Sequence, residues 1–138
     1  MLTQEIARFD AKIEITLSRK IEGNFLSEFI AGKEDRTTII FDGNSKAITI
    51  KLNEDAPPYT IPFSNVEQLI IHQHRIDETT DFRTALILKT EPRYLALYSF
   101  GNPHFGKTLF EELELKIFGH IEPASVYTDA AVKQSFNL

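Results

Sequence analysis

Alternating hydrophobic and polar positions predict β-strands along most of this chain. In the segment 12–19, residues Ile13, Ile15 and Leu17 share one face, because successive side chains of a strand point to opposite sides. Alternation also predicts a strand at 46–52, and short runs rich in β-branched, aromatic and other apolar residues predict further strands at 36–41, 59–63, 66–72, 83–90 and 93–99. Short turns join several of them, so we expect antiparallel pairing rather than a parallel, doubly wound sheet.

The turn between 36–41 and 46–52 is the clearest local feature of the sequence. It reads Asp42-Gly43-Asn44-Ser45, and Asp and Gly are residues that supply the positive φ angles of a tight hairpin. After it, we expect Ile48, Ile50 and Leu52 to point inward. Pro62 removes a backbone donor from the strand 59–63, which predicts an edge strand or a break there.

Helical spacing of apolar residues predicts three helical segments. We expect one short helix near 2–10, one or two helical turns near 24–31 and a longer helix over 106–118. Gly119 is positioned to end the longest of them. Its apolar stripe consists of Leu109, Phe110, Leu113 and Ile117, and its water-facing positions are expected to be Glu111, Glu112, Glu114 and Lys116.

Two stretches carry no strong periodicity. Residues 73–82 are polar, include Asp77, Glu78 and Asp81, and are predicted to form a loop. Residues 120–138 contain Pro123, and we interpret them as a C-terminal extension that is either a tail or packs on a neighbouring element. The remaining residues, 1–119, are expected to form a single domain.

Composition and charge limit the function classes. The chain has 138 residues and a net charge of −5, which argues against nucleic-acid binding through a basic surface. It has no cysteine, which excludes disulfides, thiol catalysis and cysteine-ligated zinc. No apolar run approaches the roughly 18 residues of a membrane span, and the N-terminus does not resemble a signal peptide. We therefore expect a cytoplasmic protein without a transmembrane segment.

Three segments of this sequence resemble the pleckstrin-homology-like (PH-like) fold, in particular the small bacterial PH-like domains. They are the hairpin TTIIFDGNSKAITIKL, the segment IPFSNVEQLIIH, and the hairpin ALILKTEPRYLALYSF followed by GKTLFEELELKIFG. The likeness covers roughly residues 36–119 and contains no diagnostic catalytic or binding motif.

The resemblance implies a mainly β fold: a barrel of about seven antiparallel strands, capped by the helix at 106–118, with short helical segments at the N-terminus. It also implies a binding or assembly module rather than an enzyme, acting through a protein partner or through self-association as an oligomer. No cofactor is expected. We do not expect phosphoinositide binding, because only Arg19 and Lys20 lie near the position of that family's basic cluster.

His72 and His74 are the candidate metal ligands. They lie two residues apart, so on a strand their imidazoles point to the same face. Asp77 or Glu78 could add an oxygen donor, although the sequence does not place a third ligand. The alternative is a structural role for two solvated histidines at the end of a strand.

The start of the predicted 106–118 helix is a second candidate site. Residues 101–108 match the spacing of a phosphate-binding loop, but the match follows an antiparallel hairpin and no strand comes after the helix. A modest anion site at Lys107 and Thr108 is a more reasonable interpretation. Tyr98 and Phe105 lie nearby and could line an aromatic pocket for a small molecule, with core packing as the alternative.

The sequence thus leaves three function hypotheses in order of preference. The first is the non-enzymatic PH-like module, which would use an exposed edge strand such as 59–63. The second is a small-molecule or anion binding protein that uses the 98–107 region. The third is a metal-assisted enzyme that uses His72 and His74.

Overall fold

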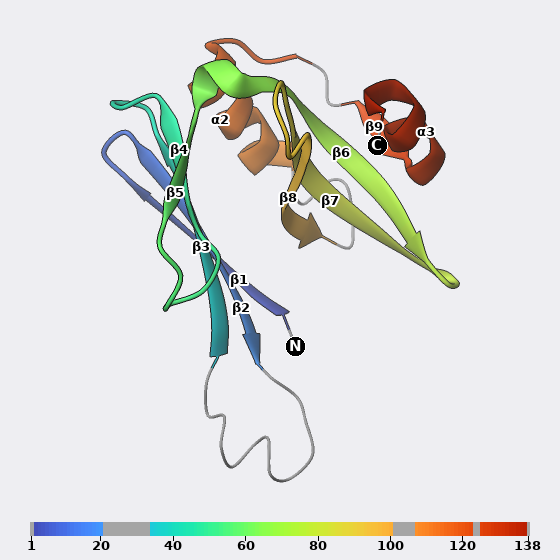
Figure 1. The fold of residues 1–138 in the computed structure, drawn as a ribbon, viewed down its shortest axis with the longest axis horizontal. Helices are drawn as coiled ribbons and strands as arrows, with labels where there is room; N and C mark the ends of the chain where they lie inside the picture. The colour runs from blue at the N-terminus through green and yellow to red at the C-terminus, as the bar shows by residue number, and fades with distance from the viewer. Residues whose placement is uncertain (1, 21–33, 101–106, 123–124, 138) are drawn as a thin grey trace, which may run out of the picture. The chain divides into compact units, whose positions relative to one another are not determined.

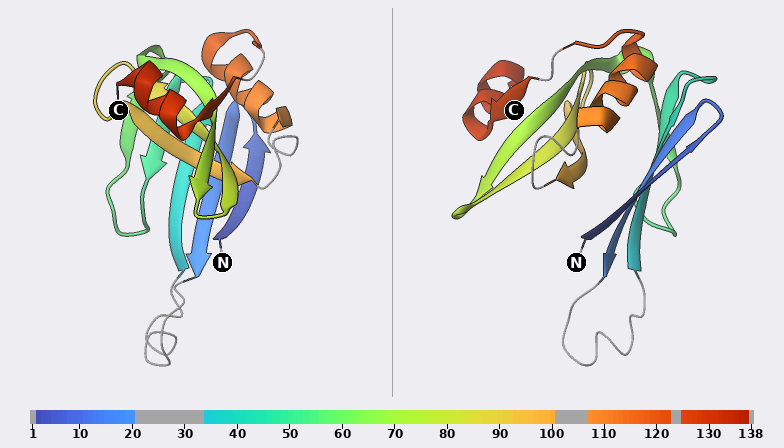
Figure 2. Two further views of the ribbon diagram at one scale, coloured as in Figure 1. Left: turned by 90° about the vertical axis from the view of Figure 1, so that its right-hand side faces the viewer. Right: turned by 180° about the vertical axis from the view of Figure 1, so that it is seen from behind.

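The computed structural model describes residues 2–20, 34–100, 107–122 and 125–137, and most of these residues are in β-strands. By their internal contacts, the residues fall into two units, Met1–Ile61 and Pro62–Leu138. Each unit contains one sheet (Figures 1 and 2). The predicted helical turns near 24–31 lie outside the described residues.

The first unit is a five-stranded antiparallel meander in the order β1-β2-β3-β4-β5. Its strands are β1 (Leu2–Phe9), β2 (Lys12–Lys20), β3 (Glu34–Asp42), β4 (Ala47–Lys51) and β5 (Tyr59–Pro62). Strand register aligns the buried side chains in rows across three strands. One row is Ile13, Phe41 and Ile48, and the next is Ile15, Ile39 and Ile50.

The predicted helix at 2–10 is wrong, because this segment forms β1. It pairs with β2 over its whole length, from Leu2 opposite Arg19 to Phe9 opposite Lys12. Asp10 has a φ of 51° in the connecting turn, a left-handed conformation that Asp tolerates better than most residues. Backbone pairing with a neighbouring strand therefore outweighs the helical spacing of the apolar side chains, of which Ile6 and Phe9 are largely exposed.

The turn at 42–45 is present, but it uses a different geometry from the one expected. The positive φ belongs to Lys46, at 53°, rather than to Asp42 or Gly43. Asp42 instead stabilises the turn with its side chain, whose Oδ1 accepts hydrogen bonds from the backbone of Asn44 at 2.9 Å and of Ser45 at 3.4 Å. These bonds lower the pKa of the Asp42 carboxyl.

The β4–β5 region contradicts one prediction and confirms two others. Leu52 lies just beyond β4 and is 52% exposed, so its predicted inward orientation is wrong. β5 is an edge strand of the sheet, as Pro62 predicts. The chain then makes a short 3₁₀ turn, Phe63–Asn65, where the sequence predicts a turn at Ser64 and Asn65.

The second unit contains a four-stranded sheet in the order β8-β7-β6-β9 and two helices. Its elements are β6 (Val66–Ile76), β7 (Thr79–Leu88), β8 (Tyr94–Phe100), α2 (Lys107–Phe118), β9 (Val126–Thr128) and α3 (Asp129–Phe136). β6, β7 and β8 are antiparallel neighbours, whereas β9 pairs with β6 in parallel.

The loop predicted at 73–82 is wrong, because β6 and β7 form one long hairpin through this region (Figure 1). Cross-strand pairs continue to Ile76 opposite Thr79, and the turn is confined to Asp77 and Glu78. Asp77 adopts a positive φ of 52° there. Thr79 and Thr80 are β-branched, so the polar stretch remains compatible with an exposed strand.

The predicted helix at 106–118 is present as α2, and Gly119 ends it with a φ of 78°. Its apolar stripe is buried at Leu109, Phe110 and Leu113. One expectation is wrong, because Glu114 is only 6% exposed instead of facing water. Burial raises the pKa of its carboxyl, although the backbone N–H of Glu122 partly offsets this. Among the described atoms, its Oε1 has no hydrogen-bond partner.

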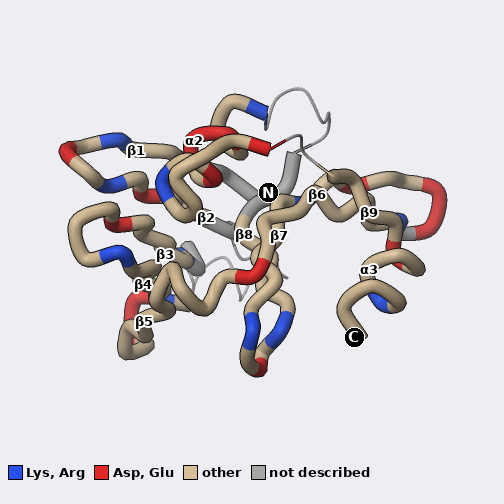
Figure 3. The backbone as a smooth tube through the Cα atoms, turned by 90° about the horizontal axis from the view of Figure 1, so that it is seen from above, with Lys and Arg blue, Asp and Glu red and all other residues tan. Residues whose placement is uncertain are grey.

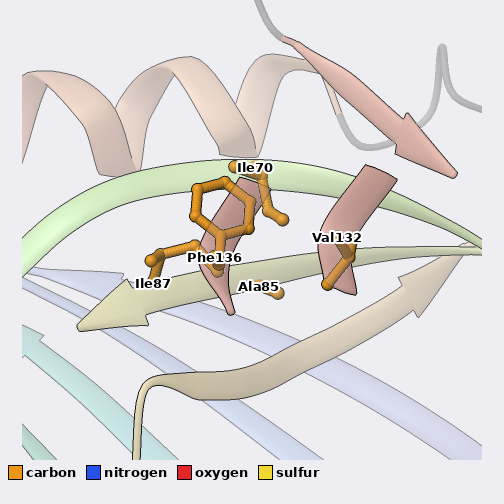
Figure 4. Packing of buried hydrophobic residues seen from close by; sticks show 5 residues of the cluster. All are labelled: Ile70, Ala85, Ile87, Val132 and Phe136. Atoms are coloured by element: carbon orange, nitrogen blue, oxygen red, sulfur yellow. The ribbon is translucent and has the colours of Figure 1, made fainter. Parts of the chain in front are cut away.

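The C-terminal extension contains two elements that pack on the sheet. α3 places Val132 and Phe136 against one face of β6 and β7, where they contact Ile70, Ala85 and Ile87 (Figure 4). The Tyr127 ring packs beside Phe136, with ring centroids 5.2 Å apart. Apolar burial of these side chains, together with the parallel pairing of β9 to β6, holds residues 125–137 on the sheet.

The predicted mainly β fold is confirmed, but the strand inventory differs from the prediction. The described residues form nine strands in two sheets rather than one closed barrel of about seven. The additional strands are β1, which was expected to be helical, and β9. Acidic and basic positions occur on both units (Figure 3). Within the part of the chain that the structure describes, no helix has the length and hydropathy needed to cross a membrane.

Candidate metal centre

The polar end of one face of β6 brings together His72, His74 and Asp129. As the spacing of the two histidines predicts, both imidazoles point to the same side of the strand, and both contact the Asp129 carboxylate. The same face carries apolar residues further from the hairpin turn. Ile70 and Ala85 pair with each other two residues beyond the His72–Arg83 pair, and Ile87 lies two residues beyond Ala85. α3 therefore covers the apolar end of the face with its body and meets the polar end with its first residue.

Local structure explains why Asp129 is held at this point. β9 pairs with β6 so that Tyr127 lies opposite His72 and Thr128 opposite Gln73. Thr128 is the N-cap of α3, and its side chain accepts a hydrogen bond from the backbone of Ala131 at 3.3 Å. Asp129 is thus the first residue of the helix, where the partial positive charge of the helix N-terminus favours a carboxylate.

The two oxygens of Asp129 have different roles. Oδ1 lies 2.7 Å from Nε2 of His72 and 2.8 Å from Nδ1 of His74, while Oδ2 accepts a hydrogen bond from the backbone of Arg75 at 3.1 Å. The hydrogen bond from His74 and then that from Arg75 hold the pKa of the Asp129 carboxyl well below its usual range. The carboxylate is therefore ionised and accepts only, so both imidazole nitrogens that face it carry protons.

Tyr94 contacts the other side of the His72 ring. Its hydroxyl lies 2.6 Å from Nδ1 of His72, and the two rings meet edge to face with centroids 5.5 Å apart. Nε2 of His72 donates to Asp129, so in the tautomer with a single ring proton Nδ1 accepts from the Tyr94 hydroxyl. Burial raises the pKa of Tyr94, and the neighbouring Arg83 guanidinium partly offsets this, so Tyr94 is protonated at neutral pH.

On β7, one pair of oppositely charged side chains lies next to the histidines. Arg83 lies directly opposite His72 in the sheet, and Asp81 lies directly opposite His74. Nε of Arg83 donates to Oδ2 of Asp81 at 2.8 Å. The charges of this pair cancel.

The donor set has the composition of a divalent-metal site. One atom from each of His72, His74 and Asp129 lies within 4.8 Å of the others. Metal–ligand distances of about 2.0–2.2 Å place cis or tetrahedral donors about 3.0–3.5 Å apart. The carboxylate oxygen lies 2.7 and 2.8 Å from the two nitrogens, which is closer than metal-bound donors lie to one another, so the three side chains would rearrange to admit an ion.

The structure places the other sequence candidates elsewhere. Asp77 and Glu78 form the hairpin turn and do not belong to the cluster. Lys107 and Thr108 are the first, exposed residues of α2. Phe105 lies outside the described residues. Tyr98 lies in β8 with Thr84 as its partner in the register, and the proposed aromatic pocket stays a prediction.

Sequence reasoning missed Asp129 and Tyr94. Asp129 had a local signal, because Thr128 followed by Asp is typical of a helix start. Nothing in the spacing of the sequence connected that start to a strand more than 50 residues earlier. Tyr94 lies in the predicted strand 93–99, and nothing in the sequence singled it out.

Comparison with protein-family models, curated proteins and solved structures gave no significant match to this chain.

Proposed function

We propose that this protein binds a divalent transition-metal ion through His72, His74 and Asp129. The observation that carries the proposal is the convergence of two imidazole nitrogens on one carboxylate oxygen, at 2.7 and 2.8 Å. Imidazole and carboxylate are the donors that zinc, iron(II), cobalt(II) and nickel(II) take in proteins. The proposal assigns metal binding and no reaction.

The surroundings of each ligand support the proposal. The backbone N–H of Arg75 holds Oδ2 of Asp129 and leaves Oδ1 to act as a monodentate ligand. Metal binding to Nε2 of His72 places the ring proton on Nδ1, which then donates to the Tyr94 hydroxyl across the same 2.6 Å contact. Orientation of a ligating histidine by a partner on its other nitrogen is a general feature of metal sites.

Direct measurement of metal binding tests the proposal. The full chain is titrated with zinc in competition with a chromophoric chelator, and the bound metal is counted after dialysis. We expect one zinc per chain. We also expect His72→Ala, His74→Ala and Asp129→Asn each to weaken binding at least about tenfold, because each removes one of three donors.

His120→Ala is the matched control. His120 is exposed, contacts Glu122 at 3.3 Å and belongs to no metal cluster among the described residues. Its replacement should leave the zinc affinity unchanged. Wild-type affinity in the Asp129→Asn and His74→Ala variants, or a loss confined to His120→Ala, would contradict the proposal.

The function expected from the PH-like resemblance stays a prediction alongside this one. It comprises the finer description of the fold as a PH-like barrel and a role in protein contacts or self-association. An exposed edge strand such as β5 is the element that such contacts would use. Metal binding does not exclude it, because the cluster and β5 involve different residues.

A further inference from the structure

We infer that the metal held by His72, His74 and Asp129 keeps an open coordination position, and that this position takes a small anionic ligand such as a carboxylate. This inference rests on the metal binding proposed above. It extends the proposal to the chemical class of the external ligand. We infer that class from the number of donors, their exposure and their charge.

The donor count leaves the coordination sphere incomplete. Among the described residues, the cluster supplies three ligand atoms, one from each side chain. Asp129 contributes a single oxygen, because its Oδ2 is held by the backbone N–H of Arg75. Four-coordinate zinc therefore lacks one ligand, and six-coordinate cobalt(II) or iron(II) lacks three.

The exposure of the donors indicates the side on which an external ligand enters. The His72 side chain is only 10% exposed and has Tyr94 behind it, so this side of the site is closed. The side chains of His74 and Asp129 are 31% and 40% exposed. An external ligand therefore reaches the metal from the solvent, between His74 and Asp129.

The charge of the loaded site favours an anion. A divalent ion brings two positive charges, the two imidazoles are neutral as ligands, and Asp129 contributes one negative charge. The Arg83–Asp81 pair on β7 adds no net charge. The loaded site thus keeps one positive charge, which one monovalent anion neutralises.

Cobalt(II) makes the open position visible, because its visible absorption depends on coordination number and ligand type. The full chain is loaded with one equivalent of cobalt perchlorate in a non-coordinating buffer. Azide, acetate and acetamide are then titrated separately while the spectrum is recorded. Acetamide is the matched neutral analogue of acetate. We expect azide and acetate to change the spectrum with saturation at one ligand per metal, and acetamide to leave it unchanged at the same concentration.

The outcomes separate this inference from the proposed function. If cobalt binds and His74→Ala abolishes that binding, but azide and acetate leave the spectrum unchanged, the open position is wrong while metal binding stands. If acetamide changes the spectrum as strongly as acetate, the preference for an anion is wrong. If cobalt does not bind, or binds equally to the His74→Ala variant, both proposals fail. His120→Ala should reproduce the wild-type response to every probe.

Discussion

Replacing Phe136 with alanine should weaken metal binding although Phe136 is not a ligand. Asp129 is the first residue of α3, so the position of α3 sets the position of the carboxylate. The buried side chains that pack α3 on β6 and β7 are Val132 and Phe136. A variant that loosens α3 removes the carboxylate from the site for part of the time. Metal affinity then falls in proportion to the fraction of molecules with α3 docked.

The magnitude follows from the burial of Phe136. Its side chain is 6% exposed, and truncation of a buried Phe to Ala typically costs about 3–5 kcal/mol. The loss of the ring contact with Tyr127 falls within that cost. The undocked state becomes the major one only when this cost exceeds the free energy with which α3 docks on the sheet. Each further 1.4 kcal/mol lowers the docked fraction, and with it the zinc affinity, tenfold. We therefore expect zinc affinity to fall about 10- to 100-fold.

The assay is the same chelator competition with zinc, together with circular dichroism to establish that the sheets remain folded. Gln134→Ala is the matched control, since Gln134 is exposed on the same helix and alanine preserves helix propensity. Phe136→Leu should give an intermediate affinity. Wild-type zinc affinity in folded Phe136→Ala would refute the reasoning that α3 docking positions the third ligand.

Three further changes test the surroundings of the site and the fold. Tyr94→Phe should lower zinc affinity about 10- to 100-fold with no change in stoichiometry, because it removes the hydrogen bond that orients His72; unchanged affinity would contradict this in the same titration. Glu114→Gln should stabilise the protein at pH 7 by about 1–3 kcal/mol in urea unfolding, because the carboxyl is buried and its Oε1 has no partner among the described residues. Its folded pKa is raised above the ordinary 4.5, so the folded state binds more protons and wild-type stability should fall as pH rises above 4.5; an equal slope in Glu114→Gln would exclude this carboxyl as the cause. Thr128→Ala should destabilise α3 by about 1 kcal/mol through loss of the N-cap, measured as faster amide hydrogen exchange in α3 than in the wild type.

The strands that the sequence predicted best are those with one buried face. In β2 and β4, apolar residues alternate with polar ones, and the register aligns them in rows with Ile39 and Phe41 of β3. The prediction failed at β1, because Ile6 and Phe9 are exposed there and their spacing therefore does not mark a buried face of the strand. The pairing of β1 with β2 is a property of two segments, and helical spacing within one of them could not reveal it.

Two of the three candidate metal ligands were predictable, for a similar reason. Two residues on one strand share a face by geometry, so the His72 and His74 spacing was sufficient to pair them. The third donor depends on the parallel pairing of β9 with β6, which has only three residue pairs. A strand this short has no periodicity of its own, and Pro123 in the preceding stretch favoured the interpretation as an extension.

The arrangement around Asp129 also indicates how metal binding and folding are related. Without metal, the carboxylate is already satisfied by two imidazole N–H groups, the backbone of Arg75 and the N-terminus of α3. The apolar contacts of Val132 and Phe136 hold the helix independently of any ion. An incoming metal therefore exchanges two N–H···O hydrogen bonds for three coordination bonds in a site that is already assembled. We accordingly expect metal to raise stability by mass action rather than to be required for folding, unlike the case of small zinc-dependent domains.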